Sequence, residues 1–153
     1  MKKYIFNIGF NKCGTTSLSS ALTILGWPTL HHRVKVKTDE NVIDIRLVDL
    51  LRTNLNNGKR CFHGLDHKYL AFSDFYGQAF YSKIYEQYPD SYFILTTRNI
   101  DDFLSSRRRH TIRNLENPNY SGGLLKVEPD KWRNHFIAKS KEPSGKITFL
   151  RLH

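Results

Sequence analysis

Short apolar runs alternate along the chain with longer segments in which apolar residues recur every three or four positions. The runs at residues 3–8 and 92–97 predict strands, and the second reads as a buried central strand. The spacing within residues 15–25, 78–88 and 101–115 predicts helices. Strands that alternate with helices are typical of a parallel sheet with helices on both faces. We therefore predict an α/β fold of three layers around a central parallel sheet.

Between these elements the pattern is weaker. Residues 29–36 fit a short strand or a loop, and residues 60–65 fit a further strand. Residues 41–56 show apolar positions at helical spacing, which predicts a helix. In the helix over residues 78–88 we expect four apolar side chains to face inward: Phe80, Tyr81, Ile84 and Tyr85.

The C-terminal third contains a turn-rich stretch followed by two more expected elements. Residues 117–123 carry Asn, Pro, Ser and Gly and are the best candidate for a lid or an acceptor-binding loop. A helix is expected from Glu128, with Pro129 suited to its first turn. Residues 146–152 predict a final strand.

Length and composition fit one globular domain over residues 1–153. Hydrophobic residues make up 39% of the chain and aromatic residues 13%, which excludes a disordered protein. No apolar run approaches the ~20 residues needed to span a bilayer. Because Met1-Lys2-Lys3 leads directly into a strand, we expect no signal peptide and a cytoplasmic location.

Cysteine content and charge narrow the classes of partner. Cys13 and Cys61 give neither a disulfide framework nor metal-ligand spacing, so both are expected to be free thiols and no metal is expected. The net charge of +10 favours a polyanionic ligand or partner. Nucleic acid is one such partner, and a donor molecule with several negative charges is another.

Residues 5–18 have the layout of an anion-binding loop. An apolar strand breaks at Gly9, a short loop carries Lys12 and Gly14, and a helix then begins with hydroxyl side chains. Glycines allow the backbone to approach a phosphate closely, and the N–H groups at a helix start favour negative charge. Lys12 adds a full positive charge.

The glycine spacing resembles that of a Walker A loop, with one decisive difference. Gly9 and Gly14 have the required separation, but Thr15 stands where the invariant lysine belongs. Residues 95–97, Leu-Thr-Thr, supply no acidic residue for magnesium. An ordinary ATP or GTP hydrolase is therefore disfavoured.

A second phosphate-binding element follows the strand predicted over residues 92–97. Arg98 would stand at the carboxyl end of that strand, where open α/β sheets bind ligands. Asn99 or Asp101 can cap the next helix, and Ser106 lies two turns into it. A guanidinium fork and a hydroxyl are both suited to a phosphate.

Together the two elements resemble the sulfotransferases, which use 3′-phosphoadenosine 5′-phosphosulfate (PAPS) as donor. The loop K-x-G-T-T-S-L and the later R-N-x-x-D-x-x-x-S carry the resemblance, which covers about residues 3–110. It implies a P-loop NTPase-like sulfotransferase fold and no metal. It also implies roles for the matching residues. Arg98 and Ser106 would hold the 3′-phosphate, and the 5′-phosphosulfate would bind to Asn11, Lys12, Cys13, Gly14, Thr15, Thr16 and Ser17.

The resemblance further implies that Lys12 is catalytic, stabilising the negative charge that develops as the donor S–O bond breaks. One departure stands out. Many sulfotransferases have a further basic, glycine-containing segment near the C-terminus, and this chain stops at His153 without it. We expect either a minimal member of the family or a truncated product.

An acceptor hydroxyl or amine must also lose a proton. Asp74 is our first choice as the general base, because it lies 24 residues before Arg98, near the place where related enzymes carry this group. It could instead cap the following helix. The competing bases are four histidines: His31, His32, His63 and His67.

We expect sulfuryl transfer from PAPS to an acceptor hydroxyl or amine, which the basic charge would allow to be anionic. Two alternatives stay open: a P-loop nucleotide-binding or kinase-like protein, and a non-catalytic basic module that binds nucleic acid or an anionic glycan. The basic run at residues 107–110 and 113 fits either a solvated helix face or an electrostatic funnel toward the site.

Overall fold

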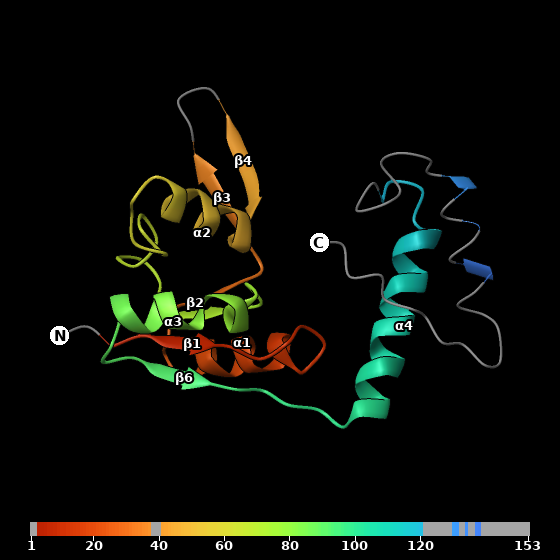
Figure 1. Cartoon of the computed structure of the whole chain (residues 1–153), viewed down its shortest axis with the longest axis horizontal. Coiled ribbons are helices and arrows are strands. Elements are labelled where there is room, and N and C mark those ends of the chain that lie inside the picture. The colour runs from red at the N-terminus through yellow and green to blue at the C-terminus, as the bar shows by residue number, and fades with distance from the viewer. Residues whose placement is uncertain (1–2, 38–40, 121–129, 132–133, 135–136, 139–153) are drawn as a thin grey trace. The chain divides into compact units, whose positions relative to one another are not determined.

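The structure is a computed structural model, and it describes residues 3–37, 41–120, 130–131, 134 and 137–138. The chain separates into two compact units, Met1–Arg98 and Asn99–His153. Figure 1 traces the elements in order, and each unit is described by itself.

A four-stranded sheet forms the centre of the first unit. Its strands are β1 (Ile5–Asn7), β2 (Thr29–His31), β5 (Ala71–Ser73) and β6 (Tyr92–Ile94), in the spatial order β2-β5-β1-β6. All neighbouring pairs are parallel, as the alternation of strands and helices predicts.

Strand β6 differs from the prediction. We predicted a central strand over residues 92–97, but the strand ends at Ile94 and lies at the sheet edge, beside β1. Tyr92 is 51% exposed and Leu95 is 61% exposed. A continuous apolar run is also compatible with an edge strand, because pairing partners are not encoded in the run itself.

Helices cover both faces of this sheet. Side chains alternate between the faces along each strand, so each face has apolar side chains that a helix buries. Phe6, Phe72 and Leu30 lie on one face, in a buried cluster with α2 (Leu47–Asn56) and α3 (Gly77–Gln87). Ile5 and Ala71 lie on the opposite face with Leu22 of α1 (Thr15–Ile24). The predicted three-layer α/β arrangement around a parallel sheet is confirmed.

Stacked aromatic rings fill the first of these faces. Phe62 packs 4.0 Å from Phe72 and 5.1 Å from Phe6 between ring centroids, and all three are almost fully buried. Phe62 comes from residues 60–65, where we predicted a strand; the structure has turns there instead. The segment is apolar because it closes the core, not because it pairs with the sheet.

A separate antiparallel hairpin consists of β3 (Arg33–Lys37) and β4 (Val42–Arg46), beside α2 (Figure 1). The prediction of a helix over residues 41–56 is therefore wrong in its first part, since α2 begins only at Leu47. Val42 and Ile45 fit helical spacing, but β-branched residues pack well in a strand.

Helix α3 buries fewer side chains than predicted. Ile84 is fully buried and Phe80 packs against the core, whereas Tyr81 and Tyr85 are 41% and 52% exposed. Both tyrosine rings lie against Phe93, at centroid distances of 5.1 and 6.2 Å. They are exposed because they cover an edge strand instead of a central one.

The second unit is described mainly through α4 (Ile100–Glu116). Asn99 caps this helix, since its side-chain oxygen accepts a hydrogen bond from the Asp101 backbone N–H at 2.9 Å. Residues 130, 131, 134, 137 and 138 are helical, in agreement with the predicted last helix. The predicted strand over residues 146–152 lies outside the described residues, as do residues 121–123 of the turn-rich stretch.

Candidate active site

The loop of residues 8–14 connects β1 to α1 and is called the anion loop below. Its backbone is constrained at two positions. Gly14, the residue before α1, has a left-handed φ of 80°, which glycine adopts without steric cost. Lys12 has φ 69° although it is not glycine, a conformation that costs about 1–3 kcal/mol and concentrates at functional sites.

Gly9 brings the anion loop close to the segment after β6. A Cβ at this position would lie 2.1 Å from the Thr96 hydroxyl oxygen, so a larger residue would force the two segments apart. The Gly9 N–H donates to the Asn7 side-chain oxygen at 2.9 Å. The glycine at which we predicted the strand to break is thus required for a close approach.

The start of α1 fits an anion. No side chain caps the helix and no acidic residue lies in its first turn, while the first N–H groups of any helix have no partner within it. Thr15 is buried; Thr16 and Ser17 are exposed beside it. Backbone N–H groups, hydroxyls and the Lys12 ammonium together make a donor set suited to phosphate or sulfate oxygens.

Arg98 reaches the same loop. Its Nη1 donates a hydrogen bond to the Lys12 backbone carbonyl at 3.1 Å, across 86 positions of sequence. Arg98, which we predicted for the 3′-phosphate, therefore contacts the backbone of the anion loop. Ser106, the other residue predicted for the 3′-phosphate, is partly buried on α4 in the second unit.

A buried polar network lies beneath the anion loop, and the sequence pattern does not predict it. Asn7, the last residue of β1, donates to the Ser73 hydroxyl at 3.0 Å and accepts from the Thr96 hydroxyl at 3.2 Å. Ser73 in turn donates to the Thr15 carbonyl at 3.4 Å. The network ties β1 and β5 to α1 and to the segment after β6. An asparagine within an apolar run was its only signal.

Two of the candidate histidines meet Asp74. Because β2 pairs with β5, with His31 opposite Ser73, the residues that end these strands lie side by side. The Asp74 Oδ2 is 3.4 Å from His32 Nδ1 and 3.9 Å from His31 Nε2. His31 Nε2 also lies 3.4 Å from the Thr15 hydroxyl. We call Asp74, His31 and His32 the Asp74 cluster.

The alternative roles of Asp74 as a helix cap and of His63 and His67 as general bases are not supported by their positions. Asp74 does not cap α3, since Tyr76 holds the cap position and no side chain caps the helix. His63 and His67 lie in the turns that precede β5. Those turns are at the amino end of the strands, where the Tyr4 hydroxyl donates to the Asp66 carbonyl.

The Asp74 cluster holds an ionised carboxylate. Burial alone would raise the pKa of Asp74, but the hydrogen bond from His32 and the charges of His32, His31 and Lys12 outweigh it and lower the pKa. The hydrogen bond to Asp74 raises the pKa of His32 against the effect of burial. Burial lowers the pKa of His31, opposed by Asp74 and assisted by His32. His31 is therefore mostly neutral at pH 7.

A small hollow of about 20 Å³ lies where the anion loop meets the turn into α3. Its walls come from five residues: Phe10, Asn11, Asp74, Tyr76 and Gln78. The anion loop and Asp74 thus share one cavity.

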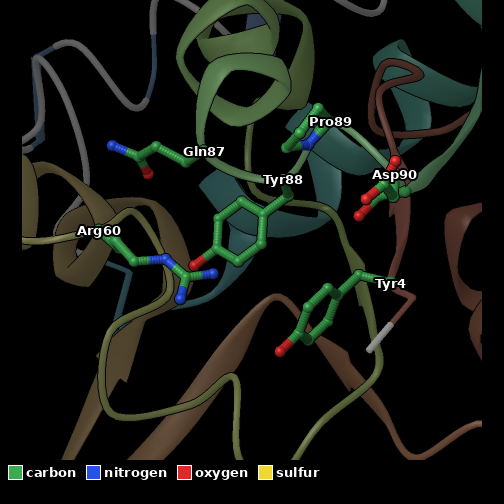
Figure 2. Close-up of a pocket in the computed structure, with 7 residues that line it drawn as sticks. Tyr4, Arg60, Gln87, Tyr88, Pro89 and Asp90 are labelled. Carbon is green, nitrogen blue, oxygen red and sulfur yellow. The ribbon is translucent and has the colours of Figure 1, made fainter. Parts of the chain in front are cut away.

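A larger cavity of about 460 Å³ lies at the opposite end of the strands (Figure 2). Tyr4 and the segment before β6 line it, and the Arg60 guanidinium lies 4.2 Å from the Tyr88 ring centroid. Arg60 is also paired with Asp66 at 3.5 Å. None of the residues predicted for the site line this cavity, and parallel sheets bind ligands at their carboxyl ends.

Both cysteines are free, as predicted. Cys61 is buried, and burial raises the pKa of its thiol to about 11, so it is unreactive at neutral pH. Within the described part of the chain, no group of three or more His, Cys, Asp or Glu side chains could hold a metal ion. No described helix is long and apolar enough to cross a membrane.

Comparison with known proteins gives one clear finding. Residues 4–142 match the family described as "Sulfotransferase domain", a range that contains the anion loop, the Asp74 cluster and Arg98. No curated protein matches the chain. Because the family match covers most of the sequence, the chain belongs to the sulfotransferase domain family.

Proposed function

We propose that this protein transfers the sulfuryl group of PAPS to an acceptor hydroxyl or amine. Membership of the sulfotransferase family gives the reaction class. The observation that carries the choice of donor is the hydrogen bond from Arg98 to the Lys12 carbonyl, in the loop that precedes an uncapped helix start. Two basic residues and a set of N–H donors in this region support a ligand with several anionic groups.

Each residue of the predicted donor site has a role in this proposal. The seven residues 11–17 surround the 5′-phosphosulfate with backbone N–H groups and hydroxyls. Lys12 holds its positive charge where the leaving oxygen gains negative charge, which is the main electrostatic demand of such a transfer. When bound, PAPS supplies an activated sulfuryl group, so these residues need only to orient and stabilise it.

Arg98 and Ser106 are proposed to bind the 3′-phosphate. Arg98 is exposed and uses one hydrogen bond to hold the Lys12 carbonyl. A guanidinium has five N–H donors, so this bond leaves capacity for a phosphate. Arg98 would then both shape the anion loop and bind the ligand.

Asp74 is proposed to accept the proton from the acceptor. It lines the hollow beside the anion loop, and its lowered pKa keeps it ionised at neutral pH. His31 and His32 orient the carboxylate, since both lie within 4 Å of it. His31 is the histidine that could take over this role, because it is mostly neutral and also contacts Thr15.

The net charge of +10 favours one rival function, a basic module that binds nucleic acid or an anionic glycan without catalysis. Such binding would be insensitive to adenosine 3′,5′-bisphosphate and independent of Lys12. A PAPS-dependent enzyme would instead bind that nucleotide, and its turnover would fall when Lys12 is replaced.

The test is PAPS turnover by the wild-type protein and by Lys12→Ala, followed as release of adenosine 3′,5′-bisphosphate in the presence of mixed acceptors. Because Lys12 acts mainly in the transition state, we expect Lys12→Ala to reduce turnover far more than donor affinity. Lys59→Ala, at an exposed position away from the anion loop, is the matched control and should behave as wild type. Normal turnover of Lys12→Ala at saturating PAPS would show that Lys12 serves binding alone.

A further inference from the structure

The hollow beside Asp74 has the size of one hydroxyl or amine group. Its volume is about 20 Å³. Roughly 10–15 Å³ is the smallest cavity that holds one water molecule, so the hollow accommodates one such group and little more. It is too small for a phosphate or a sugar ring, and therefore receives only the tip of a larger ligand.

Two of the side chains that line the hollow, Asp74 and Gln78, offer hydrogen-bond acceptors. Asp74 is ionised and can only accept hydrogen bonds. Gln78 also lines the hollow, and its Oε1 is buried without a hydrogen-bond partner in the structure. An unpaired buried acceptor is unfavourable, so a donor group that enters the hollow gains more than it would in water.

The turn between β5 and α3, which lines one side of the hollow, has an unusual backbone conformation. Asp74 and Tyr76 have left-handed φ values of 57° and 60° although neither is glycine. Between β5 and α3, this turn leaves the Tyr76 side chain 51% exposed at the rim. Phe10, 55% exposed, is the other aromatic at the rim. Two strained residues in one short turn are typical of a binding site, where strain is offset elsewhere.

We propose that the hollow receives the reacting hydroxyl or amine of the acceptor, and that Phe10 and Tyr76 hold the ring that bears this group. The proposal rests on the proposed function, because it takes Asp74 as the base of the transfer. The reacting group donates its hydrogen to Asp74, and Gln78 accepts from it when it carries a second hydrogen, or from a neighbouring hydroxyl. Phe10 and Tyr76 offer apolar ring faces, against which an open-chain alcohol packs less well than a ring does.

The acceptor class is thus a ring with an apolar face and a small polar group at its edge. Phenols and sugars share this chemistry, and the experiment separates them. Sulfuryl transfer from PAPS is measured with 4-nitrophenol, with methyl glucoside and with 1-pentanol as the open-chain reference. The binding of adenosine 3′,5′-bisphosphate is measured in parallel, because it reports the donor site independently of any acceptor.

Two substitutions give different signatures. Tyr76→Ala should lower kcat/KM for the ring acceptor by about two- to tenfold and leave 1-pentanol nearly unchanged, since only the ring uses this wall. Gln78→Leu should lower kcat/KM for amine or diol acceptors by about two- to tenfold. Tyr85→Ala is the matched control, because Tyr85 lies on the same helix with an exposure of 52% and does not line the hollow. It should leave all acceptors unchanged.

Preference for a ring acceptor that falls in Tyr76→Ala and persists in Tyr85→Ala supports the proposal. Equal turnover of 1-pentanol and both rings would overturn it. So would an unchanged kcat/KM for every acceptor in both Tyr76→Ala and Gln78→Leu, which would mean that the hollow holds only solvent. If adenosine 3′,5′-bisphosphate binds normally but neither ring is sulfated, the acceptor class is wrong while the donor site stands. Failure to bind the nucleotide contradicts the proposed function itself.

Discussion

At the scale of single residues, the chemistry of the site depends on how neighbouring groups change the pKa of Asp74. Asp74 is a partly buried carboxyl that stays ionised because His32 donates to it and because the positive charges of His32 and Lys12 lie nearby. Geometry decides which residue contacts the acceptor, and the pKa of that residue then decides whether it can accept a proton. Asp74 lines the hollow, whereas His31 and His32 contact Asp74 and do not line the hollow.

Removal of the Asp74 charge tests its role as base. General bases contribute about 10²–10⁴-fold to turnover, so Asp74→Asn should reduce kcat on that scale. Affinity for adenosine 3′,5′-bisphosphate should stay nearly unchanged, which calorimetry would verify. If Asp74→Asn keeps more than about a tenth of wild-type turnover while His31→Gln abolishes it, the base is a histidine.

The pH dependence of kcat separates the same two residues. A base must be deprotonated, so with Asp74 as base kcat falls only as the pH drops through a pKa below the usual 3.8. His32→Gln removes the hydrogen bond and a charge that lower this pKa, so the pKa should rise and the acid limb should move to higher pH. An acid limb above the usual pKa of a carboxyl and below pH 6.5 in the wild type would instead identify His31, whose pKa burial lowers from 6.5.

At the scale of elements, the carboxyl ends of three parallel strands meet through one buried side chain. Asn7 is 1% exposed and bonds to Gly9, Ser73 and Thr96. Buried polar groups are stabilising only when paired, and here the pairing also fixes the entry to the anion loop. Strand pairing therefore determines the geometry of the loop.

Asn7→Leu keeps the branching of the side chain and removes these hydrogen bonds. The buried partners lose their contacts at a cost of about 1–3 kcal/mol each, so the free energy of unfolding should fall by at least that amount. Affinity for adenosine 3′,5′-bisphosphate should fall as well, because the anion loop loses its anchor. Asn56→Leu, at an exposed asparagine of α2, is the control for urea denaturation. Equal stability of the two variants would show that the network is dispensable.

The sequence predicts the local parts of this site and misses the non-local ones. The anion loop, Arg98 and the Asn99 cap are visible because each depends on a few adjacent residues. The contact of Asp74 with His31 depends on β2 pairing with β5, which neither strand encodes. Val42 and Ile45 have helical spacing, but in β4 they lie on opposite faces of a strand, and the pairing of β4 with β3 is again non-local. The edge position of β6 is not encoded in its sequence either, because it depends on the order of the strands.

At the scale of the whole molecule, family membership and charge point the same way. The sulfotransferase match over residues 4–142 gives the reaction class, and the net charge of +10 favours a polyanionic ligand. A sequence-independent polyanion binder would need the charge alone. A PAPS-dependent enzyme also needs two phosphate sites, which we propose at the anion loop and at Arg98 and Ser106.

The most direct measurement is a calorimetric titration, without magnesium, with adenosine 3′,5′-bisphosphate, AMP and ATP in turn. We expect adenosine 3′,5′-bisphosphate to bind most tightly, because only this ligand places phosphates at both sites. A charge-assisted contact contributes about 1.5–3 kcal/mol, so its affinity should exceed that of AMP by roughly ten- to a hundredfold. Equal affinity for AMP, or tighter binding of ATP, would contradict the assignment of PAPS as donor.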